Sequence, residues 1–315
     1  MKKNLVFIST HIINEAVISE YKKMAKGKNY DYVLAIDNEN FKTEIDNRIS
    51  EKEFFGTKVK CFFFDKKLNE ELKLPKYERN NLSEDFGKIM WYNGEYRFFY
   101  VKKYFPDYDF YWQLDWDCYF NGESYDAFLD QYLDRNEDLL ILDFRKEILN
   151  GNWYHSKYVE WLYKDKEIYG SLYCISRISG RAADFLYDAI FKIEEKYKNL
   201  DDKSKSFWPF CELVTPTELM NNGYTCADIH QDTITYNKEY DLNTNRLFEH
   251  PDNLFYHPIK GDFINRENTL KKENQELKRK IKRLRIQNKT LNKKIEKLST
   301  FKFNLFGIKF SHRKT

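Results

Sequence analysis

The sequence predicts an α/β fold in which a mixed, mostly parallel sheet carries helices on both faces and is followed by a C-terminal coiled-coil helix. Three observations predict this fold. Short apolar runs alternate with helical stretches, the 315 residues are 42% hydrophobic and can fill a large core, and a seven-residue leucine repeat follows the apolar runs. Disorder is therefore not expected for the main part of the chain.

Five apolar runs have the length and composition of buried strands. They are Leu5–Ile8, Tyr32–Ile36, Val59–Phe64, Phe110–Leu114 and Leu139–Leu142. Each run stops at polar residues, which are in order Ser9 with Thr10, Asp37, Asp65, Asp115 and Asp143. Ligands of open α/β sheets bind beyond the carboxyl ends of the strands, so we expect these polar side chains to line one crevice.

Two helices are expected between the later strands. Residues 83–104 contain no proline, and the six aromatic residues at 91–100 would pack one helix onto the sheet. Residues 181–199 form a second helix, and the polar stretch 200–206 is interpreted as a mobile loop near the site or as a plain surface loop.

The charge of the chain is divided unevenly. Residues 271–315 contain 16 Lys and Arg against 3 Asp and Glu, whereas the whole chain has 53 basic and 50 acidic residues. The rest of the chain is therefore acidic, with 37 basic and 47 acidic residues. A basic tail on an acidic body indicates that the tail meets a polyanion.

The start of this tail has the pattern of a leucine zipper. Leucines at seven-residue spacing occupy d positions, and Asn or Ile four residues later occupies a positions. The leucines are Leu270, Leu277, Leu284, Leu291 and Leu298, and the a residues are Asn274, Ile281, Asn288 and Ile295. Leu at d with Ile and Asn at a favours a parallel homodimer, and the alternative is a single amphipathic helix lying on the body.

The predicted organisation has three parts: a catalytic domain at 1–262, a coiled coil at 263–299 and a basic aromatic tail at 300–315. Residues 301–314 mix aromatic and basic side chains, as interfacial membrane anchors do, although a final strand docked on the body is the alternative. A DNA-binding basic zipper needs its basic region before the leucines. Here the basic residues interleave and follow them, so no nucleic acid partner is expected.

Several other classes of protein are excluded by missing patterns. The five cysteines form no C-x-x-C pair, so neither a disulfide framework nor a zinc ribbon is indicated and a reducing cytoplasm fits best. No Gly-rich phosphate loop can be written in the sequence. The apolar run at residues 5–8 is too short for a signal peptide, and no run reaches the ~18 apolar residues of a membrane span.

Asp115 and Asp117 form the most informative motif. They follow the apolar strand at 110–114 in the sequence Tyr-Trp-Gln-Leu-Asp-Trp-Asp-Cys-Tyr-Phe-Asn-Gly, residues 111–122. At the end of a strand, such a pair can direct one carboxylate to Mn²⁺ or Mg²⁺ and the other to a ribose or a metal-bound water. The alternative is a solvated turn, because D-x-D also occurs by chance.

A hydrophobic strand followed by D-x-D, an aromatic residue and Gly resembles the GT-A class of glycosyltransferases, and more narrowly the bacterial capsule and lipopolysaccharide transferases. The resemblance covers residues 1–262 in element order, but only the D-x-D and its flanks are motif-specific. It implies a GT-A-like, Rossmann-type sheet. It also implies a divalent metal, a nucleotide-sugar donor and a glycan or lipid-linked glycan acceptor.

The same resemblance implies roles for other residues. His257 in Phe-Tyr-His-Pro-Ile-Lys-Gly, residues 255–261, would complete the metal shell with Asp115 and Asp117, and Lys260 would meet phosphate. The nucleotide-sugar site would also include residues at the ends of strands and in the segment at 170–177. These residues are Ser9, Thr10, Asp37, Asp115, Gly170 and Ser171. Ser9, Thr10 and Asp37 can equally be helix caps or turn residues, and His257 can be structural.

Inverting transfer needs a carboxylate that deprotonates the acceptor hydroxyl. Glu212 lies in an aromatic segment and is the candidate base, unless it pairs with Arg177 or Arg181. Residues Asp143, Asp228 and Asp232 are the alternatives, and retaining chemistry needs no such base.

These features together predict a hexosyltransferase-like enzyme. It would move a sugar from a nucleoside diphosphate to a bacterial surface glycan such as capsule, lipopolysaccharide or O-antigen. UDP is the first candidate for the nucleotide. We expect it in the cytoplasm or at the inner face of the cell membrane. A nucleotidyltransferase, or a non-catalytic scaffold dimerised by the zipper, is the alternative.

Overall fold

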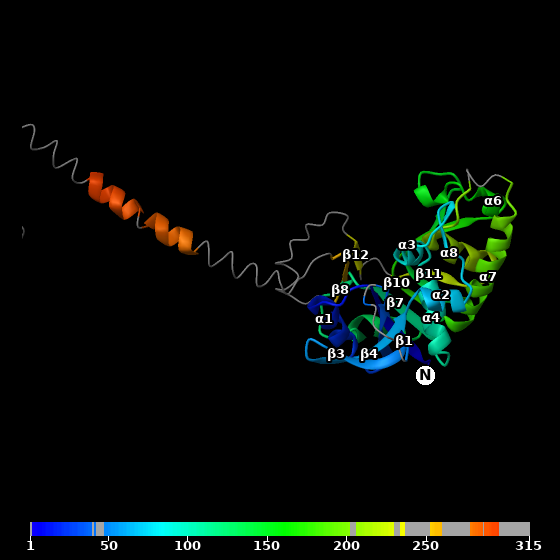
Figure 1. Cartoon of the computed structure of the whole chain (residues 1–315), viewed down its shortest axis with the longest axis horizontal. Helices are drawn as coiled ribbons and strands as arrows, with labels where there is room; N and C mark the ends of the chain where they lie inside the picture. Colours follow the sequence, from blue (N-terminus) through cyan, green and yellow to red (C-terminus); the bar gives the residue numbers. More distant parts are fainter. Residues whose placement is uncertain are drawn as a thin grey trace, which may run out of the picture. The chain divides into compact units, whose positions relative to one another are not determined.

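The computed structural model describes residues 2–39, 41, 47–201, 206–229, 234–236, 253–259, 278–285 and 287–295. The chain divides into two compact units, Met1–Lys260 and Gly261–Thr315, and each is considered by itself. Figure 1 labels the elements and colours them along the sequence, from blue at the N-terminus to red at the C-terminus.

An eight-stranded sheet forms the centre of the first unit. Its strands are β1 (Asn4–Thr10), β2 (Asp31–Asp37), β3 (Ile49–Phe54), β4 (Thr57–Phe64), β7 (Phe110–Asp115), β9 (Leu139–Glu147), β10 (Ile168–Ser179) and β11 (Cys226–Ile229). They lie in the order β11-β9-β10-β7-β1-β2-β4-β3. Neighbours pair in parallel at β1/β2, β1/β7, β2/β4 and β9/β11, and antiparallel at the other three contacts. The predicted mixed, mostly parallel sheet is confirmed, and all five expected strands are present.

Helices cover both faces of this sheet. They are α1 (Glu15–Met24), α2 (Lys66–Glu71), α3 (Phe86–Tyr92), α4 (Tyr96–Tyr104), α5 (Asp126–Leu129), α6 (Glu160–Tyr163), α7 (Gly180–Lys198) and α8 (Cys211–Asn221). Short 3₁₀ turns lie at Asp130–Tyr132 and Tyr154–Ser156. Along β1, Leu5 and Phe7 pack with α2, α3, α4, α7 and α8, whereas Val6 and Ile8 pack with α1 and α5. This alternation follows from the two-residue period of a strand.

The expected single helix at 83–104 is wrong, because the chain forms α3 and α4 with a break between them. The break is at residues 93–95, where the side-chain amide of Asn93 donates to the carbonyl oxygens of Tyr77 and Ile89. The Trp208 indole also donates to Asn93 Oδ1 at 2.7 Å. A Cβ at Gly94 would lie 3.1 Å from the Tyr173 ring, so a larger residue here would require the ring to shift by a few tenths of an ångström. The helix expected at 181–199 is confirmed as α7.

Two of the carboxylates expected in the crevice have other roles. Asp65 caps α2 by accepting from the Leu68 amide at 2.9 Å, and it pairs with Arg48. Asp143 has a left-handed backbone with φ of 56° and pairs with Arg145. Asp65 follows the end of β4 as expected, but Asp143 lies inside β9, which continues to Glu147.

A small second sheet holds the segment around His257. It is formed by β12 (Ile234–Tyr236), β13 (Phe255–His257) and β8 (Tyr119–Phe120), and β13 pairs antiparallel with β8. The buried carboxylate of Glu20 on α1 accepts from the Phe120 amide at 3.0 Å and from the Tyr125 hydroxyl at 3.1 Å. This helix therefore fixes the turn that carries Asp117 and, through β8, the strand that carries His257.

The second unit is helical at 278–285 and 287–295, within the predicted coiled coil. Its apolar side chains Ile281, Leu284, Leu291 and Ile295 are exposed. The helical conformation is confirmed, and the parallel dimer stays a prediction. The tail at 300–315 and the segment 202–205 lie outside the described residues. Among the residues that the structure describes, no helix has the length and apolarity needed to span a membrane.

Candidate functional site

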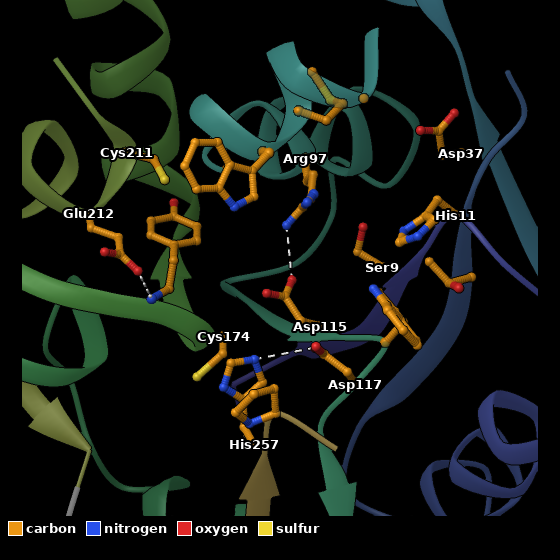
Figure 2. Close-up of a pocket in the computed structure, with 18 of the residues that line it drawn as sticks. Ser9, His11, Asp37, Arg97, Asp115, Asp117, Cys174, Cys211, Glu212 and His257 are labelled. Atoms are coloured by element: carbon orange, nitrogen blue, oxygen red, sulfur yellow. Dashed lines mark hydrogen bonds and ion pairs between the residues drawn. The ribbon is translucent and has the colours of Figure 1, made fainter. Parts of the chain in front are cut away.

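A cavity of about 820 Å³ lies at the carboxyl ends of the parallel strands β1, β2 and β7. Ser9, Thr10, Asp37 and Asp115, which end these strands, all line it. The register of β1 against β7 pairs Ser9 with Asp115. Figure 2 shows Ser9, Asp37 and Asp115 around the cavity, so the predicted crevice exists at the ends of these expected strands.

Asp115, Asp117 and His257 meet at the floor of this cavity, and we call them the carboxylate–histidine triad. Their possible ligand atoms all lie within 4.8 Å of one another. His257 Nε2 is 3.3 Å from Asp117 Oδ1. Pairing of β13 with β8 brings His257 to the turn after β7, and the Ile259 amide donates to the Asp117 carbonyl at 2.9 Å. Two residues 140 positions apart in sequence are therefore placed together by backbone pairing.

The electrostatics of the triad favour a bound cation. Burial lowers the pKa of His257, but the Cys174 thiolate and the Asp117 carboxylate outweigh burial and raise this pKa to about 11. Burial, with a contribution from Asp117, raises the pKa of Asp115 to about 6, and the Arg97 guanidinium opposes that increase. Negative charge therefore gathers here, and a proton on His257 balances it. Two carboxylates and an imidazole are a donor set that Mn²⁺ or Mg²⁺ accepts, and such an ion would replace the proton.

Arg97 on α4 is a cavity residue that the sequence reasoning missed. Its Nη1 lies 3.0 Å from Asp115 Oδ1. The side chain is 18% exposed, and its Nε has no hydrogen-bond partner among the described residues. A single charged residue within the aromatic run at 96–100 was the available signal. Its guanidinium is placed to bind an anion in the cavity.

Glu212 lies in the first turn of α8 and lines the cavity. Its Oε1 accepts from the Tyr173 amide at 3.2 Å. Burial raises the pKa of Glu212 to about 8, and negative charge on Cys174 and Asp115 adds to the increase. A carboxyl with this pKa can exchange a proton near neutral pH.

The structural alternative for Glu212 does not hold. Arg177 is buried and donates to the carbonyl oxygens of Tyr132, Arg135 and Glu137. Arg181 forms a two-point ion pair with Asp138. Neither arginine is therefore the partner of Glu212.

The alternative bases are placed less favourably. Asp143 pairs with Arg145, and Asp228 Oδ1 accepts from the Phe144 amide at 3.1 Å. Neither residue lines the cavity. Asp232 lies outside the described residues.

Thr10 and Asp37 form local turn contacts at the strand ends where Ser9 also lies. The Thr10 hydroxyl donates to the Ile12 carbonyl at 2.5 Å and accepts from the Ile12 amide at 3.1 Å. Asp37 accepts from the Glu39 amide at 3.0 Å, and burial raises its pKa to about 6. All three residues also line the cavity, and their role in binding a nucleotide sugar stays a prediction.

The segment at 170–177 reaches the cavity at Leu172, one residue beyond the expected pair Gly170 and Ser171. Gly170 and Ser171 do not line it, and the Ser171 hydroxyl instead donates to the Glu212 carbonyl at 3.0 Å. The lining residues of β10 are Leu172, Tyr173 and Cys174. Lys260 lies outside the described residues, so its predicted contact with phosphate stays a prediction.

The remaining histidines are separate from the triad. His11 lines the cavity and contacts the Trp116 ring edge-on, with 5.1 Å between ring centroids. His155 stacks on Phe210 at 4.0 Å. His230 and His250 lie outside the described residues.

No protein-family model matches the chain, and no curated protein matches it in sequence. Solved structures with a related arrangement of elements include a glycosyltransferase involved in glycosylation of the major capsid of PBCV-1. It is 12% identical with a TM-score of 0.39, covering 85% of this chain and 98% of that chain. Mouse xyloside xylosyltransferase 1 is 11% identical with a TM-score of 0.41, covering 81% and 97%. An active-site mutant of LgtC is 12% identical with a TM-score of 0.40, covering 82% and 88%. These values do not assign the chain to a family.

Proposed function

We propose that this protein is a metal-dependent glycosyltransferase that uses a nucleoside diphosphate sugar as donor. A UDP-sugar is the first candidate for this donor. The observation that carries the proposal is the carboxylate–histidine triad at the carboxyl edge of the sheet, with the cation Arg97 3.0 Å from Asp115 in the same cavity. A cation-binding group and a fixed guanidinium in one cavity suit a diphosphate. The cavity volume of about 820 Å³ lies within the range of small-molecule sites and can hold a nucleotide sugar.

Each wall of the cavity has a separate task in this proposal. Asp115, Asp117 and His257 would hold Mn²⁺ or Mg²⁺, which neutralises charge on the departing diphosphate when bound. Arg97 adds a second positive group on the same side. Ser9, Thr10 and Asp37 offer hydroxyl and carboxylate groups to the base and ribose. Their position at strand ends supports this role.

Glu212 is the candidate for activating the acceptor hydroxyl. Its side chain enters from α8, on a different wall from the triad, as Figure 2 shows. Its raised pKa matches a group that must accept a proton near neutral pH. This role applies to inverting transfer. Retaining transfer would use the same donor site without a general base.

The acceptor in this proposal is a bacterial surface glycan, such as capsule, lipopolysaccharide or O-antigen, alone or linked to lipid. The basic composition of residues 271–315 supports binding of the protein to the anionic inner face of the cell membrane. The zipper pattern supports a dimer, which would present two basic tails to the same surface.

Thermal unfolding with nucleoside diphosphates, with and without Mn²⁺, tests the donor site. We expect UDP with Mn²⁺ to raise the melting temperature of the wild type and to have little effect on Asp117→Ala. Asp107→Ala changes an exposed aspartate of the loop before β7 and is the matched control, which should keep the full shift. No shift with any nucleotide in either protein would reject the donor site and favour the scaffold.

A further inference from the structure

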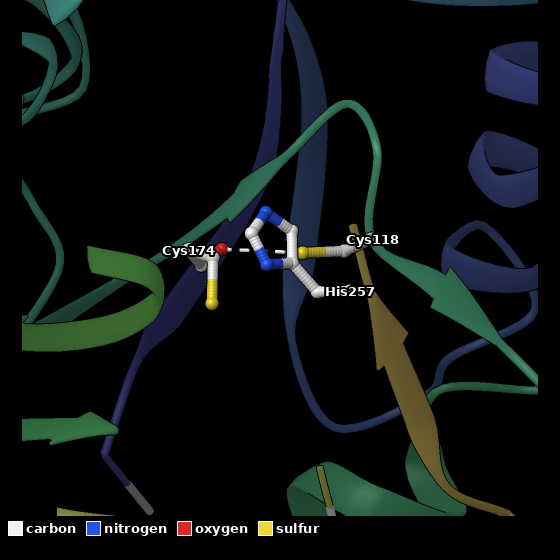
Figure 3. Close-up of side chains that lie close together, drawn as sticks. All are labelled: Cys118, Cys174 and His257. Carbon is white, nitrogen blue, oxygen red and sulfur yellow. Dashed lines mark hydrogen bonds between the residues drawn. The ribbon is translucent and has the colours of Figure 1, made fainter. Parts of the chain in front are cut away.

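Two thiols lie close to His257 of the triad, and we call Cys118, Cys174 and His257 the thiol–histidine cluster. The two sulfur atoms and one imidazole nitrogen lie within 4.8 Å of one another. The Cys118 thiol donates to the Cys174 carbonyl at 3.4 Å, as Figure 3 shows. His257 therefore belongs to two groups of potential ligands, one with oxygen donors and one with sulfur donors.

The backbone builds this cluster from three separate segments. Antiparallel pairing of β10 with β7 sets Ile175 opposite Leu114, which leaves Cys174 beside the turn after β7. In that turn the Cys118 amide donates to the Asp115 carbonyl at 3.0 Å. Because β13 pairs with β8, His257 is fixed to the same turn. The ligand atoms are thus held by sheet register before any ion binds.

The donor set selects a different cation from the one that the triad accepts. Thiolate sulfur and imidazole nitrogen suit Zn²⁺, whereas Mn²⁺ and Mg²⁺ prefer oxygen ligands. A tetrahedral zinc ion with bonds of ~2.3 Å to sulfur and ~2.0 Å to nitrogen separates its ligands by roughly 3.5 to 4 Å. Side-chain rotations that move each ligand atom by less than about an ångström would shorten the distances between the ligand atoms to that range.

We propose that Cys118, Cys174 and His257 form a second cation site, selective for Zn²⁺, that competes with the carboxylate–histidine triad for His257. Zn²⁺ bound to His257 would lie beside Asp117, so it would take a ligand from the triad and repel a second divalent ion there. The zinc site does not depend on the proposed function. Its consequence, inhibition of the metal-dependent transfer by Zn²⁺, rests on that function.

An ion can reach this site and remain there. Cys174 and His257 line the cavity, which gives a path from solvent. Cys118 and Cys174 are only 3% and 4% exposed, so bound water would not easily replace them. The Asp117 carboxylate, 3.3 Å from His257 Nε2, is the nearest fourth ligand. Three or four such donors are typical of zinc sites in proteins.

Titration of the reduced, metal-free full chain with Co²⁺ tests the site, because Co²⁺ replaces Zn²⁺ and gives a thiolate charge-transfer band in the near ultraviolet. We expect one equivalent of Co²⁺ to produce the band and one equivalent of Zn²⁺ to abolish it. Cys118→Ser and Cys174→Ser should each weaken it strongly. Cys61→Ser is the matched control, since this buried thiol also donates to a carbonyl but lies on β4, and it should keep the band. Co²⁺ bound without a thiolate band, or a band unchanged in both cysteine variants, would overturn the proposal.

A second measurement on the wild type avoids dependence on the folding of variants. Bound Mn²⁺ gives a weak electron paramagnetic resonance signal and free Mn²⁺ a strong one. Addition of one equivalent of Zn²⁺ should release bound Mn²⁺ if His257 is shared, and retention of Mn²⁺ beside bound Zn²⁺ would refute the competition. A thiolate band in a protein that binds no nucleotide would uphold the zinc site while rejecting the proposed function.

Discussion

The Arg97 guanidinium lies 3.0 Å from the Asp115 carboxylate, and both side chains face the cavity in which we place the donor diphosphate. The ion pair joins α4 to the end of β7. It supplies a positive charge that lowers the pKa of Asp115 against the effect of burial. Arg97 is therefore placed to orient a metal ligand and to contact an anion.

Replacing Arg97 with Ala should weaken UDP binding in the presence of Mn²⁺ by roughly 10- to 100-fold, the usual cost of one charge-assisted hydrogen bond. Arg97→Lys should lose part of this affinity, because an ammonium keeps the charge without the two-point geometry. Isothermal titration calorimetry measures both. Equal UDP affinity in the wild type and Arg97→Ala would exclude a contact between Arg97 and the diphosphate.

Asp117→Asn should reduce Mn²⁺ affinity by at least about tenfold, since it removes a charged ligand from the triad. It should also lower the pKa of His257, because the Asp117 carboxylate helps to raise it. Mn²⁺ titration followed by electron paramagnetic resonance checks the first effect, and the histidine resonances in nuclear magnetic resonance check the second. Asp107→Asn should leave both values unchanged.

Glu212→Gln tests the general base. In the wild type, transfer should rise with pH through about 8, because the carboxyl must lose its proton before it can accept one. The variant should lose this dependence and fall by about 10²- to 10⁴-fold in kcat, while its UDP affinity is kept. A variant with wild-type kcat would remove Glu212 from the mechanism and favour retaining chemistry.

Glu95, directly before α4, should make folding stability depend on pH. It is fully buried, and neither carboxylate oxygen has a hydrogen-bond partner among the described residues. Burial raises its pKa from 4.5 to about 8. The folded protein therefore keeps a proton on Glu95 that the unfolded chain releases above pH 4.5. The contribution of this protonated side chain to folding stability is full below pH 4.5 and is lost as pH rises to about 8.

Glu95→Gln should remove this dependence without changing the shape of the side chain. Between pH 5 and pH 9, the wild type should lose up to roughly 4 kcal/mol of unfolding free energy more than the variant. Urea unfolding of both proteins across this range gives the difference directly. Parallel curves for the two proteins would show that Glu95 does not titrate in this way.

The zipper pattern predicts a dimer that depends on its apolar positions. Leu284 and Leu291 are exposed in the described helix, and their replacement with Lys should convert the protein to a monomer. Arg283→Lys, at a position outside the a and d series, is the control and should stay dimeric. Sedimentation equilibrium distinguishes the two states. A monomeric wild type would contradict the prediction at once.

Much of the fold could be predicted because buried strands and their polar ends are local patterns. The runs ending at Ser9, Asp37 and Asp115 predicted both the strands and three of the residues that line the cavity. The break between α3 and α4 was missed because its cause is not local. Asn93 is held by Tyr77 and Trp208, which lie in other segments.

The site was predicted less completely for the same reason. Asp115, Asp117 and Glu212 were found from their neighbours in sequence, and His257 from the family resemblance. Arg97 became a functional candidate only when α4 placed it 3.0 Å from Asp115. The thiols became candidates only when the register of β10 and the pairing of β13 placed them beside His257. The spacing of these residues in the sequence does not predict that they are close together in the folded protein.

Release of UDP from a panel of UDP-sugars, measured with and without Mn²⁺, decides whether the triad supports metal-dependent transfer. The wild type should release UDP from at least one sugar only when Mn²⁺ is present, and His257→Ala should be at least about 100-fold slower. Release at the same rate without metal, or in His257→Ala, would show that the triad does not hold a catalytic metal.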